Sequence, residues 1–165
     1  GRLGHGDEED QPTPKLIEAF TEIRQYGVSN LDTDDCSAFT AAGGRAMQVN
    51  QVLYNLAQRG IEWDLLDWMA ENRRVTMAYS PFDGGALLDH AGLARFADAR
   101  DMTSAQVCLA WLLAHDNVLP IPKSATPERV AENAESAHWQ LDAEDMAELD
   151  DLFAPPSGPE PLQIY

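Results

Sequence analysis

The fold is decided by a stretch that runs from Met47-Gln-Val-Asn-Gln-Val52 through the segment Glu62–Asn72 to Arg74-Val-Thr-Met-Ala-Tyr79. The two outer segments are short and contain apolar and β-branched residues, which is typical of strands. The middle segment has apolar residues at helical spacing. A strand, a helix and a second strand in this order predict a βαβ unit whose strands run parallel.

The same alternation continues over the rest of the chain. Gly43-Gly44 is expected to end a helix, Thr103 and Gln106 have the spacing of a capping box, and Thr126-Pro127 is typical of a helix start. The expected strands are 25–30, 47–52, 74–79 and 118–121, the expected helices are 15–23, 33–42, 62–72, 93–99, 104–115, 126–137 and 143–152, and residues 82–90 are expected to form a loop. This order predicts an α/β fold with a parallel sheet.

The chain is short and acidic. Its 165 residues suit one domain, which we place at 15–154, after a loop or disordered segment over 1–14 and before a tail over 155–165. It carries 28 Asp and Glu against 11 Lys and Arg, a formal net charge of -17. Nucleic acids and anionic membrane surfaces attract Lys and Arg, so we expect neither as a partner.

Hydropathy and cysteine content indicate a packed cytoplasmic protein. The hydrophobic fraction is 44%, and we assign to the core the large side chains Tyr54, Trp63, Trp68 and Trp111. No apolar run approaches the roughly 18 residues that span a bilayer, and no signal peptide is visible. Two cysteines, Cys36 and Cys108, make no disulfide framework and fit a reducing compartment. The histidines lack metal-ligand spacing, so we expect no metal site.

Polar side chains follow each expected strand, at the edge where parallel strands place their ligands. The residues in question are Ser29-Asn30, Asn50-Gln51, Tyr79-Ser80-Pro81 and Lys123-Ser124. Amides suit a carboxamide, and a tyrosine offers a flat face to an aromatic ring. Lys123, Ser124 and Arg129 surround the start of the helix at Thr126-Pro127, which suits a phosphate. Together these groups predict a nicotinamide nucleotide site. We interpret Asn50 and Asn55 as local caps or turn residues rather than ligands, and Ser29 and Asn30, taken alone, are equally explained as a strand-to-helix cap.

Four stretches carry a resemblance to a known family: Ile23–Asn30, Val49–Asn55, Met77–Pro81 and Ile121–Asn133. In this order and spacing they resemble the C-terminal half of an aldo-keto reductase, over residues 15–155. Members of that family are (β/α)8 barrels of the TIM type and oxidoreductases that bind NADPH. The resemblance therefore implies a partial barrel of about four βα units with a C-terminal helix.

The resemblance also implies roles for individual residues. Ser29, Asn30 and Gln51 would hold the nicotinamide carboxamide, and Tyr79 would stack on its ring. The loop from Ser80 and Pro81 to Leu88 would line the pyrophosphate. The adenosine 2′-phosphate would lie among Lys123, Ser124 and Arg129, and Glu132 and Asn133 would contact the adenine.

The family's catalytic Asp, Tyr, Lys and His have no matching motif in this chain. We therefore interpret it as the cofactor-binding half of an NADPH-dependent reductase of aldehydes or ketones, which starts after the units that carry the tetrad and is inactive alone. A missing N-terminal half would complete the barrel around a small carbonyl substrate. Two alternatives stay open: a non-catalytic relative that binds a nucleotide or a protein, and a structural half-barrel that forms a homodimer.

Overall fold

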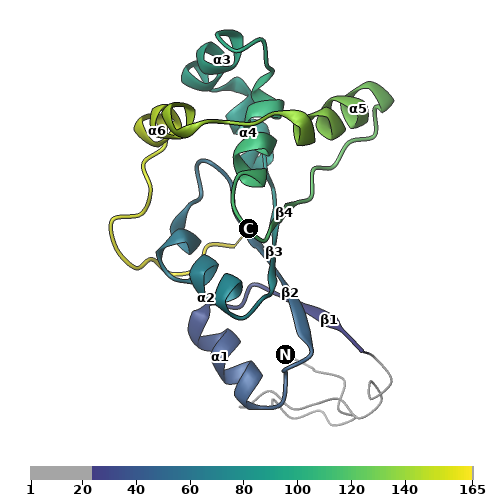
Figure 1. The fold of residues 1–165 in the computed structure, drawn as a ribbon, viewed down its shortest axis with the longest axis vertical. Helices are drawn as coiled ribbons and strands as arrows, with labels where there is room; N and C mark the ends of the chain where they lie inside the picture. The colour runs from purple at the N-terminus through teal and green to yellow at the C-terminus, as the bar shows by residue number, and fades with distance from the viewer. Residues whose placement is uncertain (1–23, 165) are drawn as a thin grey trace.

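The computed structural model describes residues 24–164, and its centre is a parallel sheet of four strands in the order β1-β2-β3-β4. The strands are β1 (Tyr26–Ser29), β2 (Met47–Leu53), β3 (Val75–Tyr79) and β4 (Val118–Pro120). Neighbours in the chain are neighbours in the sheet, as Figure 1 shows. The expected parallel α/β fold is confirmed, and its four strands form an open row rather than a closed barrel.

Helices follow the strands largely where the sequence predicts them. The α-helices are α1 (Thr33–Ala41), α2 (Leu65–Glu71), α3 (Ala91–Asp98), α4 (Ser104–Leu113), α5 (Pro127–Glu135) and α6 (Ala143–Leu152). Within residues 24–164, the short 3₁₀ segments are η2 (Gly60–Trp63), η3 (Asp83–Asp89) and η4 (Ser136–His138). The capping box of Thr103 and Gln106 is present at α4, and α6 has a second one from Asp142 and Asp145. The expected helix over 15–23 lies outside the described residues.

Two expectations differ from the structure in local detail. The expected loop over 82–90 contains the 3₁₀ turns of η3, which are interrupted at Gly84 and Gly85, whose φ values of 63° and 105° are not helical and suit glycine. The expected helix over 62–72 is broken at Asp64, where φ and ψ are -152° and -33°. That break turns the Trp63 side chain outward, so Trp63 is 48% exposed instead of belonging to the core.

Two helix starts also differ from the pattern. Thr126 precedes α5 but its side chain makes no capping hydrogen bond. At a different helix, α3, His90 is the cap, because its Nδ1 accepts a hydrogen bond from the Leu93 amide at 3.1 Å. The ring of His90 also packs against Phe153, with centroids 4.8 Å apart. An imidazole nitrogen thus fills the place that sequence patterns reserve for Ser, Thr, Asp or Asn.

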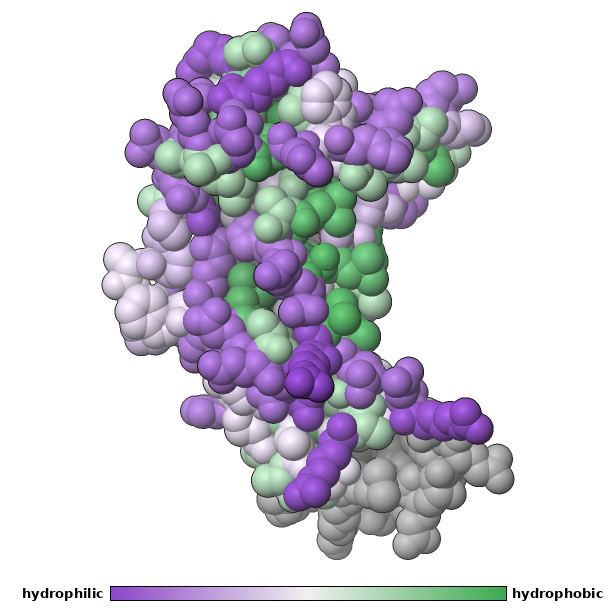
Figure 2. All heavy atoms as spheres, viewed as in Figure 1, coloured by the Kyte–Doolittle hydropathy of each residue, from purple (hydrophilic) through white to green (hydrophobic). Residues whose placement is uncertain are grey.

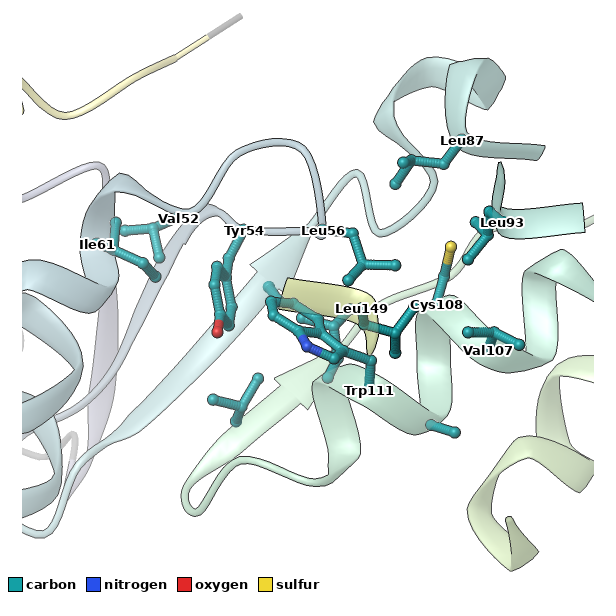
Figure 3. Packing of buried hydrophobic residues seen from close by; sticks show 14 of the residues in the cluster. Val52, Tyr54, Leu56, Ile61, Leu87, Leu93, Val107, Cys108, Trp111 and Leu149 are labelled. Atoms are coloured by element: carbon teal, nitrogen blue, oxygen red, sulfur yellow. The ribbon is translucent and has the colours of Figure 1, made fainter. Parts of the chain in front are cut away.

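The hydrophobic core lies between the sheet and α4. Every residue of α4 from Gln106 to Leu112 is buried, which explains why this helix is apolar on all sides. Trp111 of α4 lies against Tyr54, with ring centroids 5.2 Å apart, and Leu149 of α6 lies in the same cluster (Figure 3). Tyr54 and Trp111 are therefore core residues, as expected.

The two faces of the sheet differ in cover. The face formed by Asn50, Thr76 and Val118, which are partners across three strands, is buried. Leu119 on the opposite face is 46% exposed, and its neighbour Met77 is half-buried. Figure 2 shows apolar side chains gathered in the hollow over β3 and β4. Among residues 24–164 no helix covers this face and no strand pairs with the outer edges of β1 and β4. We call it the uncovered face.

Candidate functional site

A pocket of about 850 Å³ lies where β3 and β4 end. We call it the strand-end pocket. Its walls come from the loop after β3, from the first residues of α4 and from the segment that joins β4 to α5. It brings together seven predicted site residues: Ser80, Pro81, Lys123, Ser124, Arg129, Glu132 and Asn133. Segments that are more than 50 residues apart in sequence therefore form one concave surface at the edge where parallel sheets bind ligands.

The wall after β3 is built from backbone in unusual conformations. Ser80 and Asp83 have φ values of 51° and 50°, and Gly84 and Gly85 follow with positive φ. Asp83 N donates to the Ser80 carbonyl at 3.0 Å, and Gly85 N donates to the Phe82 carbonyl at 2.8 Å. Successive residues of left-handed conformation form concave turns whose amides can face an anion. This wall therefore has a shape suited to a phosphate or pyrophosphate.

Two cations lie on the opposite wall. Lys123 and Arg129 are exposed, and within residues 24–164 neither is paired with a carboxylate. Between them α5 begins at Pro127, and its first amides and helix dipole favour an anion. Ser124 is held in place by a hydrogen bond of 3.2 Å from Thr126 N to its Oγ. Cations, a helix start and a hydroxyl therefore converge on one end of the pocket.

The floor of the pocket contains a contact that the sequence did not predict. Thr103 Oγ1 donates to Glu132 Oε1 at 2.6 Å and so joins the start of α4 to α5. Thr103, Ser104 and Ala105 line the pocket although we did not assign them to it. The capping-box spacing was the available signal, because it places the amino end of α4 at this edge of the sheet.

The other four predicted residues do not line the strand-end pocket. Ser29 and Gln51 are partners on β1 and β2, and Ser29 Oγ donates to the Gln51 carbonyl at 3.0 Å. Tyr79 ends β3 beside Leu53 of β2. Asn30 follows β1 with a φ of 54°, and its Oδ1 is a buried acceptor without a donor in the described part of the chain. These residues line the carboxyl edge of the sheet next to the pocket.

Of the two asparagines in β2 and its following loop, Asn55 closes a local turn, as expected, whereas Asn50 bonds to the segment after β1, 19 residues away. Asn50 Nδ2 donates to the Leu31 carbonyl at 2.7 Å, and its Oδ1 accepts from Leu31 N. Asn55 Oδ1 accepts from the amides of Ala57 and Gln58 at 2.9 and 3.0 Å. Both side chains are fully buried.

A different arginine is buried and fully paired. Arg59, 8% exposed, binds both carboxylate oxygens of Glu62 at 2.8 and 2.9 Å and Asp150 Oδ1 at 2.7 Å. It also donates to the Phe153 carbonyl, and Tyr54 Oη donates to Glu62 at 2.8 Å. Burial lowers the pKa of Arg59, but the hydrogen bonds and charges of Glu62 and Asp150 outweigh it and raise the pKa. We call these five residues the Arg59 cluster.

Both cysteines are buried free thiols. Burial raises the pKa of Cys36 to about 11, although the charge of Arg74 opposes the shift. Burial likewise raises the pKa of Cys108 to about 12. Thiols of this kind are protonated at neutral pH and are poor nucleophiles.

Within residues 24–164, no group of three or more His, Cys, Asp or Glu side chains is placed to hold a metal ion. No helix in that range is long and apolar enough to cross a bilayer.

Comparison with known proteins gives a consistent result. The model of the Aldo/keto reductase family matches residues 13–154. The chain is 40% identical over 156 residues to methylglyoxal reductase YeaE of Escherichia coli K12, which covers 91% of this chain and 55% of that protein. It is 33% identical over 144 residues to glyoxal reductase of Bacillus subtilis 168, covering 87% and 51%. The chain spans about half the length of the curated relatives it matches.

Solved structures agree with the sequence relatives. An aldo-keto reductase from Klebsiella pneumoniae in complex with NADPH superposes with a TM-score of 0.82 and 42% identity, covering 86% of this chain and 52% of that one. A second structure of aldo/keto reductase from that organism, with NADP and acetate, superposes equally well.

Proposed function

This chain belongs to the aldo/keto reductase family, and from that membership we propose that it forms the NADPH-binding half of a reductase of aldehydes or ketones. The observation that carries the proposal is the strand-end pocket. It combines Lys123, Ser124 and Arg129 at a helix start with a wall of left-handed backbone after β3. One nucleotide with a 2′-phosphate and a pyrophosphate would satisfy both walls.

Each part of the cofactor has a place in the proposal. Lys123, Ser124 and Arg129 would hold the 2′-phosphate, which favours NADPH over NADH, and Glu132 and Asn133 would contact the adenine. Ser80 and Pro81 would begin the loop beside the pyrophosphate. Ser29, Asn30 and Gln51 would hold the nicotinamide carboxamide, and Tyr79 would stack on the ring. Asn30 Oδ1 supports this placement, because a carboxamide N–H would satisfy its unused acceptor.

NADPH supplies a hydride when it is bound, and the residues named here would orient it toward a carbonyl carbon. A general acid must also give a proton to the carbonyl oxygen. We propose that this acid and the rest of the tetrad come from a part of the enzyme other than residues 24–164. Relatives that are methylglyoxal and glyoxal reductases point to small carbonyl compounds as the substrate class.

We propose that the chain supplies strands five to eight of the barrel, with its domain at 15–154 and a tail from 155. The uncovered face and the two open edges of the sheet support this placement, since an apolar sheet face and free edges need a partner. The occupant we infer is the four-stranded N-terminal half. A stable dimer in sedimentation would favour a second copy of this chain instead.

We also infer a cytoplasmic location. Its support is the pair of buried free thiols, Cys36 and Cys108, because disulfides are rare in reducing compartments.

The proposal is tested by titrating the chain with NADPH and NADH and following the fluorescence of the nicotinamide. We expect NADPH to bind more tightly than NADH. Lys123→Ala and Arg129→Ala should each weaken NADPH about 10- to 100-fold, because each removes a charged hydrogen bond to phosphate. NADH binding should change little in either variant.

Arg45→Ala is the matched control, because Arg45 is equally exposed but precedes β2 at the amino end of the sheet. It should leave both affinities unchanged. If neither nucleotide binds, or if NADPH binds the Lys123 and Arg129 variants as tightly as the wild type, the cofactor assignment is wrong.

A further inference from the structure

One fully buried side-chain amide, that of Asn55, contacts a residue that lines the strand-end pocket and has no part in the binding just proposed. Asn55 is 0% exposed and follows β2. Its Oδ1 closes the turn at Ala57 and Gln58, as described above. Its Nδ2 makes a different contact, a hydrogen bond of 2.9 Å to the carbonyl of Ser80, 25 residues away. A single side chain therefore joins the loop after β2 to the loop after β3.

Ser80 is the residue at which the chain leaves β3 and enters the pocket wall. Its φ of 51° is unfavourable for a residue with a side chain, so surrounding contacts must hold it there. Two donors hold its carbonyl, Asn55 Nδ2 at 2.9 Å and Asp83 N at 3.0 Å. Because Pro81 has no N–H and a fixed φ, it adds no donor of its own.

The position of Ser80 is transmitted along the wall. The Asp83 amide that bonds to Ser80 is followed by Gly84 and Gly85, which line the pocket with positive φ. The Gly85 amide in turn donates to Phe82, another lining residue. Loss of the Asn55 contact would leave the Ser80 carbonyl with one donor. The backbone turn from Ser80 to Gly85 would then be held less firmly at its first residue.

We propose that Asn55 is a positioning residue for the cofactor, which sets the pyrophosphate wall of the strand-end pocket by holding the Ser80 carbonyl. The inference rests on the proposed function, namely that this pocket binds NADPH. Asn55 touches no cofactor itself. It acts through Ser80 and the turn that ends at Gly85.

Two probes and two variants test this. Asn55→Ala removes the amide, and Asn55→Ser keeps a polar group for the turn but is too short to reach Ser80. NADPH would contact the whole pocket, whereas adenosine 2′-monophosphate reaches only the end with Lys123 and Arg129. We expect NADPH to bind each variant about tenfold more weakly, the size typical of losing one buried hydrogen bond. Adenosine 2′-monophosphate should bind as it does to the wild type.

Hydrogen exchange of the Asp83 and Gly85 amides gives a readout without cofactor. Both amides should exchange faster in the Asn55 variants. Asn50→Ala is the matched control, since Asn50 is an equally buried amide of β2 that bonds to Leu31 instead. In that variant the exchange of Asp83 and Gly85 should not change.

The outcomes separate the two proposals. If the wild type does not bind NADPH, the proposed function fails, and Asn55 loses its role for the cofactor with it. If the wild type binds NADPH and the Asn55 variants bind it equally well, only the present inference fails. Equal weakening of both probes, or unchanged exchange of Asp83 and Gly85, would also overturn it, because Asn55 would then support the fold in general.

Discussion

The Arg59 cluster and the strand-end pocket both contain arginine, and they place its charge in opposite surroundings. Arg59 is 8% exposed and has two carboxylates, a carbonyl and, 5.1 Å from its guanidinium, the Trp111 ring. Arg129 is exposed and, within residues 24–164, has no carboxylate partner. The comparison teaches that a buried arginine paired with carboxylates holds the fold together. An exposed cation without a carboxylate partner, beside the start of a helix, can instead bind an anion.

The position of each arginine explains the difference. Arg59 follows β2, and its partners Asp150 and Phe153 lie at the end of α6, so it fastens the last helix to the core. Lys123 lies between β4 and α5, and Arg129 lies in the first turn of α5. Among the described residues, the only other charged residue lining the pocket, Glu132, is already bonded to Thr103. In the described residues neither pocket cation therefore forms an ion pair, although Glu132 lines the same pocket.

The largest expected effect is on Arg59. Arg59→Met leaves Glu62, only 15% exposed, without its cation and should lower the free energy of unfolding by about 3 kcal/mol, the lower end of what breaking a buried ion pair costs. Urea denaturation measures the loss. Arg100→Met is the control, because Arg100 is 22% exposed and its partners Asp145 and Glu148 are 18% and 51% exposed, so its loss should be smaller, about 1 kcal/mol. Equal losses of unfolding free energy in the two variants would mean that the deeper burial of the Arg59 cluster does not make its ion pairs more important for stability.

The next effect is the pH dependence of stability that the buried thiol of Cys36 causes. The pKa of Cys36 is raised to about 11 from an ordinary 9.0, because burial disfavours the thiolate. Between pH 9 and 11 the unfolded chain therefore releases a proton that the folded chain keeps, and the free energy of unfolding falls. The loss from this one group should be about 2 kcal/mol, and it is fully absent below pH 9.

Unfolding measured in urea at pH 8 and at pH 10.5 gives this difference. Cys36→Ala should show a smaller fall than the wild type, since it has no thiol to ionise. Cys108 and Tyr54, whose pKa values burial also raises, should account for the slope that remains in the variant. A wild type and a Cys36 variant with the same pH dependence would contradict the assignment.

Local patterns predicted much of the fold. The sequence pattern placed α6 at its observed bounds, and the capping box of Thr103 and Gln106 helped to place α4 within two residues. Both helices begin with a side-chain cap, which depends on short-range chemistry. The breaks were harder. Trp63 was assigned to the core on the assumption of a continuous helix, and the irregular backbone at Asp64 turned it out. Such a break depends on how η2 packs against other parts of the fold rather than on the residues next to it in sequence.

The candidate site divides in the same way. Lys123, Ser124 and Arg129 were predictable because rare cations lie beside a recognisable helix start. The contacts of Asn55 with Ser80 and of Arg59 with Phe153 span 25 and 94 residues, and no pattern within a segment carries them. Only the spacing of Arg59 and Glu62, three residues apart, gave a local signal for the cluster.

The smallest expected effect is on the free energy of unfolding when the two exposed cations of the strand-end pocket are removed. The double variant Lys123→Ala, Arg129→Ala should unfold in urea within about 0.5 kcal/mol of the wild type, because exposed side chains without partners contribute little. Ligand should reveal the difference. NADPH at 100 times its dissociation constant should stabilise the wild type by about 2.7 kcal/mol, and the variant should lose most of that gain. If the variant is destabilised without NADPH as strongly as Arg59→Met, the pocket cations support the fold, and their openness is not evidence for a ligand.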